Sequence, residues 1–311
     1  MRGAFIRGLV EIADRDPRVL LVTGDLGFTV IEPFADRYPE RFFNAGVSEQ
    51  NMVGLATGLA EAGFIPFVYS IATFATLRPY EFIRNGPILH HLPVRIIGVG
   101  GGFDYGPAGP THYGLEDLGI MRIQPGIGVV CPADHEQAAA ALAATWDLPG
   151  PVYYRIGKDE KTCVPGLGGR FRLGAADQVR EGTDLLIVAS GAIACQAVAA
   201  ADALAAEGAG CSVLVVSSLN PPPVADLADA LGRFGVALTV ESHYVTGGLG
   251  SLVAEVIAEN GIGCRLVRCG VDRSPDGRTG SERWMHAQSG LSVEGLVASA
   301  RGALAGACLT G

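Results

Sequence analysis

The sequence predicts an α/β protein built from two doubly wound domains. Short runs rich in β-branched residues alternate with Ala- and Leu-rich stretches of helical periodicity, which is the pattern of parallel α/β units. Of the 311 residues, 49% are hydrophobic and only 18% are charged, as expected when parallel strands are buried on both faces and a subunit interface is large. The periodicity fades near the middle of the chain, where a linker would separate the domains.

The first domain is expected to span residues 1–160. Its predicted strands are Val19–Thr23, Pro66–Tyr69, Val94–Val99, Gly128–Cys131 and Val152–Ile156. Its predicted helices are Arg2–Ala13, Glu49–Ala62 and His135–Trp146. Asp134 precedes the last of these helices and is a plausible N-cap, because its side chain can accept a hydrogen bond from an unpaired backbone N–H group.

A Gly-rich, polar stretch at 161–183 predicts the linker, and residues 184–311 predict a second α/β domain. The strands expected in that domain are Leu185–Ala189, Val213–Ser217, Ala237–Val240 and Arg265–Arg268. The expected helices are Ala192–Glu207, Val224–Phe234 and Gly250–Asn260.

The composition disfavours several classes of protein. A net charge of −9 argues against nucleic acid as the main partner. No run approaches the roughly 18 apolar residues of a membrane-spanning helix, and the N-terminus lacks the apolar core of a signal peptide, so we expect a cytoplasmic protein. The seven cysteines are scattered, and Cys264 and Cys269 fit no usual zinc spacing. We therefore expect reduced, mostly buried thiols and no metal ligands in this chain.

Glu49 begins a predicted helix. Ser48 is a candidate N-cap for it, and its apolar face would consist of Met52, Leu55 and Leu59. The helix dipole favours an acidic residue in a first turn whether or not that residue has a function. The local sequence therefore leaves a structural and a functional interpretation of Glu49 open.

Asp25 and Leu26 lie upstream of Glu49 and follow the first predicted strand. An Asp at the carboxyl end of a parallel strand is a favoured ligand position, although turn-forming Asp is equally common there. Downstream, the segment 70–84 carries aromatic residues that fit a plain core as well as a ligand pocket. The loop 98–112 is too rich in Gly for ordinary core, lacks the Lys-Ser/Thr ending of a phosphate-binding loop, and ends in Gly-Pro-Thr-His112.

The segments Gly46–Met52 (Gly-Val-Ser-Glu-Gln-Asn-Met) and Gly109–His112 (Gly-Pro-Thr-His) resemble the transketolase family. That family includes the deoxyxylulose-phosphate synthases and, more distantly, the β subunits of 2-oxo-acid dehydrogenases. The resemblance covers essentially the whole chain and is strongest up to about residue 160. It implies a pyrimidine-binding domain that uses thiamine diphosphate, followed by a transketolase C-terminal-like domain.

The resemblance also implies roles for single residues. Glu49 would hydrogen-bond the aminopyrimidine ring of the cofactor, and its pocket should be dry enough for the carboxyl group to hold its proton. His112 would contact the cofactor-bound substrate and transfer protons. Leu77 falls where an aromatic residue often sits, so the stacking face would be partly aliphatic. The cofactor-binding positions carried over are Asp25, Leu26, Phe74, Leu77 and Tyr80.

The substrate-binding positions carried over by the same resemblance are Arg2, Thr29, Gly100, Ala108 and Arg155. The planar guanidinium groups suit a phosphate or carboxylate, although both arginines fit surface salt bridges as well. Ala108 stands where transketolases carry an Asp that reads hydroxyl configuration. Gly100 stands where they carry a His that helps to hold the acceptor phosphate. We therefore expect a substrate other than the usual pentose phosphates.

The resemblance also shows what this chain lacks. The family holds the metal-bound diphosphate with a Gly-Asp-Gly segment and a downstream Asn, and no Gly-Asp-Gly occurs here. We therefore expect a separate subunit to hold the diphosphate and its Mg²⁺ (or Ca²⁺), in an α2β2 assembly by family likeness. In the second domain, the turn Val240–Ser251 resembles a strand–loop–helix turn of the family rather than a dinucleotide-binding fingerprint. We expect that domain to serve dimerisation, with His243 near the mouth of the site.

These observations favour the β-type subunit of a two-component, thiamine-diphosphate-dependent transketolase-like enzyme. It would transfer a two-carbon ketol unit from a ketose, as a sugar or sugar phosphate, to an aldehyde. A 2-oxo-acid dehydrogenase β subunit is disfavoured by the Pro-Thr-His ending, and decarboxylating deoxyxylulose-phosphate synthases are normally single chains. A non-catalytic relative need not keep Glu49, Phe74 and His112 together. The sequence does not identify the donor or the acceptor.

Overall fold

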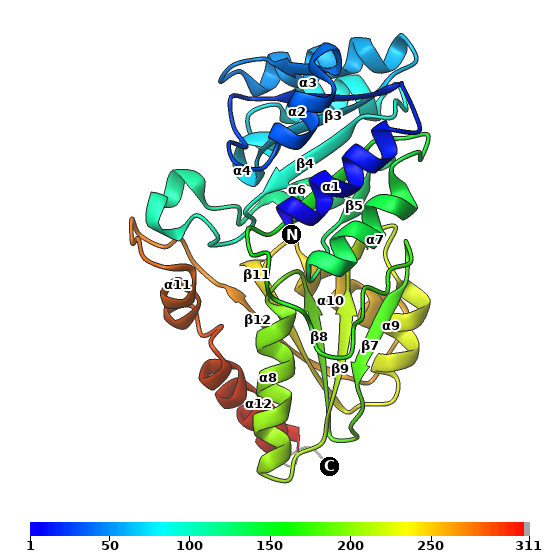
Figure 1. Ribbon diagram of the computed structural model, residues 1–311. Helices are drawn as coiled ribbons and strands as arrows, with labels where there is room; N and C mark the ends of the chain where they lie inside the picture. The colour runs from blue at the N-terminus through cyan, green and yellow to red at the C-terminus, as the bar shows by residue number, and fades with distance from the viewer. Residues whose placement is uncertain (308–311) are drawn as a thin grey trace.

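The computed structural model describes residues 1–307 and consists of two α/β domains joined end to end (Figure 1). Each domain is built on one mostly parallel sheet, of seven strands in the first and five in the second. This architecture confirms the predicted fold class. Among the described residues, none of the helices is both long enough and apolar enough to cross a bilayer.

The first sheet has the strand order β10-β5-β6-β4-β3-β1-β2. Its strands are β1 (Val19–Thr23), β2 (Phe42–Asn44), β3 (Ile65–Ile71), β4 (Arg95–Val99), β5 (Gly128–Val130), β6 (Val152–Ile156) and β10 (Ser218–Asn220). The helices of this domain are α1 (Arg2–Ala13), α2 (Glu32–Arg37), α3 (Glu49–Glu61), α4 (Ala72–Thr76), α5 (Tyr80–Ile83), α6 (Asp117–Arg122) and α7 (His135–Thr145). All strands are parallel except β10, which comes from the second half of the chain and pairs antiparallel with β5.

Both faces of this sheet are covered, which explains the near-continuous apolar strands. Successive residues of a strand point to opposite faces, and Leu21 and Val22 of β1 accordingly belong to different core clusters. One cluster packs the sheet against α1 and α7, where the Phe5 ring meets Tyr154 edge to face. The other packs it against α3 and α6. Asp134 caps α7 as predicted, because its side chain accepts a hydrogen bond from the backbone N–H of Gln137 at 2.8 Å.

The second sheet has the order β12-β11-β8-β9-β7. Its strands are β7 (Ala176–Arg180), β8 (Leu185–Ser190), β9 (Cys211–Val216), β11 (Val236–Tyr244) and β12 (Arg265–Val271). Its helices are α8 (Ala194–Ala206), α9 (Val224–Leu231), α10 (Leu249–Glu259), α11 (Glu282–Gln288) and α12 (Val293–Ala307). The edge strand β7 pairs antiparallel with β9 and lies inside the segment predicted as linker. Sequence analysis missed it because its side chains are mostly half-exposed and polar.

The six cysteines among the described residues are free thiols, and four of them are buried. This agrees with the expectation of reduced, mostly buried thiols; Cys308 lies outside the described residues. Cys163 is exposed and Cys195 is half-buried. These two thiols lie in the segment after β6 and at the start of α8.

Candidate active site

The candidate residues gather at the carboxyl edge of the first sheet, where the loops after its parallel strands meet. The turn after β1 carries Asp25, α4 follows β3 and carries Phe74, and the Gly-rich loop after β4 carries His112. Glu49 begins α3, which follows β2. The topology therefore brings together side chains that are far apart in the sequence.

Glu49 is 1% exposed and is held by two side chains. The Ser70 hydroxyl donates a hydrogen bond to its carboxylate at 3.1 Å, and Nη1 of Arg78 donates to the other oxygen at 2.8 Å. Glu49 is therefore buried, with the cation of Arg78 beside its carboxylate. Ser48 occupies the N-cap position as predicted, but its side chain does not cap the helix, because its hydroxyl donates to the carbonyl of Ala45.

Arg78 also stacks on an aromatic ring. Its guanidinium carbon lies 3.8 Å from the centroid of the Phe74 ring, while the same group is hydrogen-bonded to Glu49. A flat group with N–H donors therefore fits between this ring and this carboxylate. Arg78 reaches the site from solvent, since 41% of its side chain is exposed.

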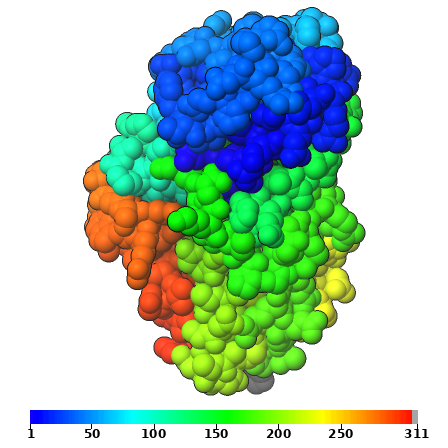
Figure 2. Space-filling model, in the orientation of Figure 1, coloured from blue at the N-terminus to red at the C-terminus, as the bar shows by residue number. Residues whose placement is uncertain are grey.

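His112 also lies against the Phe74 ring. The two rings meet edge to face, with centroids 5.1 Å apart. His112 Nδ1 and the Thr111 hydroxyl are hydrogen-bonded at 2.9 Å, and Nε2 has no hydrogen-bond partner within residues 1–307. The backbone of its loop is supported by the second domain, where the segment around Gly280 packs against Gly106 (Figure 2).

The turn after β1 borders Glu49. A Cβ placed on Gly24 would lie 3.5 Å from a Glu49 carboxylate oxygen, so the turn passes directly over that group. Asp25 adopts a positive φ of 60° and accepts a hydrogen bond from the Asn44 side chain at 2.9 Å. The backbone of Leu26 is fixed by the hydroxyl of Thr23.

Three further candidate residues are Thr29, Leu77 and Tyr80. Thr29 has a φ of 69° and its backbone N–H donates to Glu32. The Leu77 side chain follows Phe74 by one helical turn and is 46% exposed. The Tyr80 hydroxyl is turned toward the end of α6, donating to the carbonyl of Ile120 at 2.8 Å and accepting from Gln124. The structure thus does not bring the Tyr80 hydroxyl into contact with Glu49 or His112.

Arg155 is buried and ion-paired. It is 6% exposed, its Nε lies 2.9 Å from the Asp117 carboxylate, and its Nη2 donates to the carbonyl oxygens of Gly114 and Ser242. The ion pair fits the salt-bridge interpretation, except that it is buried and ties β6 to the second domain instead of lying on the surface. Removing one partner of such a pair leaves an uncompensated buried charge.

The substrate positions Gly100 and Ala108 flank an unforeseen residue, Tyr105. A Cβ on Gly100, whose φ is 75°, would lie 2.2 Å from the Tyr105 ring. Tyr105 thus fills the space beside Gly100, and its ring centroid lies 6.2 Å from that of His112. Lys158 stands 4.1 Å above the Tyr105 ring. Burial raises the pKa of Tyr105, and the nearby positive charge of Arg2 opposes that rise.

Sequence reasoning therefore missed Ser70, Arg78, Tyr105 and Lys158. The four-residue spacing of Phe74 and Arg78 is the one available signal, because residues at i and i+4 on a helix are neighbours, although α4 itself ends at Thr76. Nothing in the sequence indicated that a lysine after β6 would reach a tyrosine in the loop after β4. That contact exists because β4 and β6 are adjacent in the sheet.

The expectation for His243 is wrong. It is 1% exposed, its Nδ1 donates to the carbonyl of Tyr244, and its Nε2 accepts the backbone N–H of Gly119 at 3.2 Å. The residue links the two domains through these hydrogen bonds. The following turn is equally closed, because Glu241 accepts hydrogen bonds from the backbone N–H groups of Leu249 and Gly250 at the start of α10. A protein carboxylate thus occupies the place where a dinucleotide phosphate would bind.

Comparisons with known proteins agree with this arrangement. Residues 1–161 match the family model of the transketolase pyrimidine-binding domain, and residues 174–294 match that of the transketolase C-terminal domain. The first of these matches implies that the chain binds thiamine diphosphate.

Relatives match over nearly the whole chain. One of the subunits of an apulose-4-phosphate transketolase from Phocaeicola vulgatus is 34% identical, over 96% of both chains. A 6-deoxy-6-sulfo-D-fructose transketolase subunit from Clostridium sp. is 33% identical over 96% of this chain and 93% of that protein. A solved structure described as a split-gene transketolase, inactive β4 tetramer, is 35% identical, superposes with a TM-score of 0.86 and covers 98% of this chain and 97% of that one. The chain therefore belongs to the transketolase family, as the β-type subunit of a split enzyme that carries the pyrimidine-binding and C-terminal domains.

Proposed function

We propose that this subunit works in a two-component transketolase that transfers a two-carbon ketol unit from a ketose to an aldehyde acceptor. The observation that carries the proposal is the position of the Arg78 guanidinium, which is hydrogen-bonded to Glu49 and stacked on Phe74. An aminopyrimidine ring is likewise flat and carries N–H donors. The pocket thus has the ring and the carboxylate that such a group needs, and the His112 ring contacts the Phe74 ring.

Different residues of this chain would have different roles in the reaction. When bound, thiamine diphosphate supplies the electron sink that allows a carbon–carbon bond next to a carbonyl group to break. Glu49 would hold and orient the aminopyrimidine through a hydrogen bond from its dry pocket, Phe74 would support the ring, and burial would keep water away from both. His112, with Nε2 free, would transfer protons to and from the oxygen atoms of donor and acceptor.

The diphosphate and its metal ion would be held by the partner subunit. Mg²⁺ requires oxygen ligands in near-octahedral geometry, and this chain lacks the Gly-Asp-Gly segment that supplies them in the family. The related structure of β subunits alone is described as an inactive tetramer, which supports a need for the second subunit. We propose an α2β2 assembly with the active site between the two kinds of subunit.

The substrate is proposed to be a ketose with an anionic group, distinct from the usual pentose phosphates. Two observations support this. The names of the two relatives specify a sugar phosphate and a sulfo sugar, both anionic. In this chain, Tyr105 fills the space beside Gly100, and the cations Arg2 and Lys158 lie near Tyr105.

A decarboxylating synthase is the second candidate. The chain is 34% identical to a 1-deoxy-D-xylulose-5-phosphate synthase from Syntrophotalea carbinolica, over 96% of this chain but only 47% of that protein. The two reactions differ in one product, since only the synthase releases carbon dioxide from a 2-oxo acid. Measuring ketol transfer and carbon dioxide in one assay separates them.

The first experiment is calorimetric titration of thiamine diphosphate with Mg²⁺ into this chain alone and into the chain co-expressed with a candidate Gly-Asp-Gly partner. We expect binding only in the mixture, followed by ketol transfer from anionic ketoses. Tight binding to the isolated chain would contradict the split site. Cofactor binding without any carbon–carbon bond cleavage across ketose donors would contradict the proposed reaction.

A further inference from the structure

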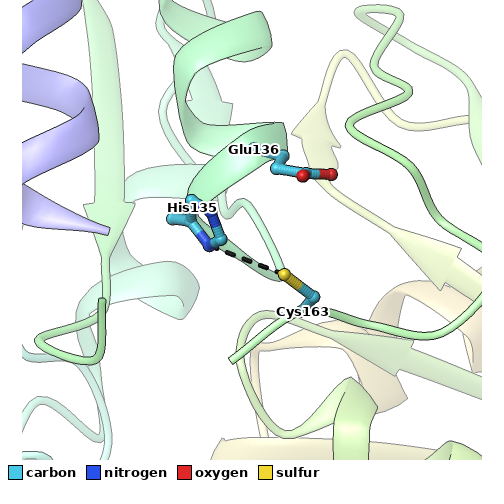
Figure 3. A group of neighbouring side chains, drawn as sticks. All are labelled: His135, Glu136 and Cys163. Atoms are coloured by element: carbon cyan, nitrogen blue, oxygen red, sulfur yellow. Dashed lines mark hydrogen bonds between the residues drawn. The ribbon is translucent and has the colours of Figure 1, made fainter. Parts of the chain in front are cut away.

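A second cluster of potential ligands lies away from Glu49, at the start of α7. His135 and Glu136 are the first two residues of that helix, and Cys163 comes from the segment after β6 (Figure 3). One ligand atom from each of the three residues lies within 4.8 Å of the others. His135 Nδ1 and Cys163 Sγ are 3.8 Å apart. In a tetrahedral zinc site, bond lengths of about 2.0 and 2.3 Å place such a nitrogen and sulfur about 3.5 Å apart.

The backbone on both sides of this cluster is fixed by one buried residue. Asp134 is 1% exposed; one of its carboxylate oxygens accepts the N–H of Gln137, and the other accepts the N–H of Val164 at 2.9 Å. The same side chain therefore holds the helix that carries His135 and the segment that carries Cys163. The ligand groups meet because of this shared anchor, without a contribution from the metal.

The surroundings of the cluster are anionic. The carboxylates of Asp134 and Asp159 accept the backbone N–H groups of Val164 and Thr162, the two neighbours of Cys163. Together with the carboxylate of Glu136, they attract a cation to this position.

We propose that His135, Glu136 and Cys163 bind a thiophilic divalent cation of the Zn²⁺ class. Imidazole, thiolate and carboxylate are all zinc ligands, and their half-buried to exposed positions leave a fourth site for water. On binding, the Cys163 thiol would release its proton to solvent and the sulfur would bond to the metal. The site is separate from the Mg²⁺ proposed to be held by the partner subunit, which needs oxygen ligands.

Such an ion would tie the segment after β6 to α7. The same segment carries Lys158, which stands over Tyr105, and Glu160, which accepts the backbone N–H of Gly3 at 2.7 Å. Fixing the segment would therefore also fix the substrate-side lysine and the start of α1. Metal binding would raise the stability of the chain by mass action, because the unfolded chain does not present the ligands together.

The test uses the full-length chain, freed of metal with a chelator and kept reduced. Titration with Co²⁺, a spectroscopic substitute for Zn²⁺, should give one equivalent of binding with a thiolate-to-cobalt charge-transfer band. Zn²⁺ should displace the cobalt and raise the melting temperature. Cys163→Ser should abolish the band, and His135→Gln should weaken binding by at least about tenfold.

Cys195→Ser is the matched control. Its Sγ is 3.6 Å from the carbonyl oxygen of Cys163, but it is not one of the three ligands, so the band should remain. Circular dichroism of each variant checks that the chain is folded. The proposal is overturned if the native chain gives no thiolate band, or if the band survives in Cys163→Ser and disappears in Cys195→Ser.

Discussion

Arg78 pairs with the buried carboxylate of Glu49 across 2.8 Å. The two side chains differ in exposure: that of Glu49 is 1% exposed and that of Arg78 is 41% exposed. The carboxylate is fixed at the start of α3, whereas the guanidinium can move into solvent. Arg78 thus fills a place that a flat ligand with N–H donors would need, and under the proposed function it would leave Glu49 to let an aminopyrimidine ring bind there.

Glu49→Gln tests the catalytic role. Glutamine keeps the shape and can still accept the hydrogen bond from Ser70, but it has no proton to exchange with the ring. We expect the reconstituted enzyme to lose turnover by about 10²–10⁴-fold with an unchanged assembly state, measured by steady-state kinetics and gel filtration. Glu40→Gln, an exposed acid on the same domain, is the control and should retain activity. Normal turnover in Glu49→Gln would remove the proposed mechanism.

Arg78→Gln tests whether the arginine acts mainly in the cofactor-free protein. Its loss leaves a buried carboxylate with Ser70 as its remaining side-chain partner, so the free chain should lose about 1–3 kcal/mol of stability, less than a fully buried pair would. The loss should shrink once cofactor and partner are bound. Denaturation with and without the cofactor measures both values, with the exposed Arg84→Gln as control. An equal loss in both states contradicts the idea that Arg78 leaves Glu49.

The core elements and the position of the site could be predicted because each rests on a local pattern. Apolar runs fix strands such as β1 and β6, and the motifs around Glu49 and His112 lie directly at strand and helix ends. The edge strand β7 was missed because one exposed face and polar side chains remove the apolar signal. Periodicity identifies buried strands better than partly exposed ones.

Contacts between segments that are far apart in the chain could not be predicted from the sequence. Arg155 was expected at a substrate; its Nε lies beside Asp117 and its Nη2 is bonded to two carbonyl groups, partners that the sequence did not indicate. His243 was expected at the mouth of the site, but it is buried against Gly119. Both outcomes depend on how the two domains pack together. Periodicity within one element carries no information about that packing.

Lys158→Met tests the proposed anionic substrate. The substitution keeps an apolar chain over the Tyr105 ring and removes the charge. If Lys158 binds an anionic group, KM should rise by about 10- to 100-fold, the effect of losing a charge-assisted hydrogen bond, while kcat changes little. The exposed Lys161→Met is the control. An unchanged KM for every anionic ketose would show that the charge of Lys158 does not contact the substrate.

Because of His286, we expect the stability of the folded chain to fall at acidic pH, independently of catalysis. Burial, with Arg155 adding to the effect, lowers the pKa of His286 to about 4, and its Nε2 is paired with the Ser242 hydroxyl at 2.8 Å. In the unfolded chain this histidine has a pKa near 6.5. Between about pH 6.5 and 4 it is therefore protonated in the unfolded chain but not in the folded chain. The contribution of His286 to stability is therefore complete above about pH 6.5 and is lost as the pH drops toward 4, by about 3 kcal/mol in total. Urea denaturation across this range should show the free energy of unfolding falling with pH in the native chain. The profile should be flatter in His286→Gln, whose amide does not titrate. Parallel profiles for the two proteins would show that other groups cause the acid sensitivity.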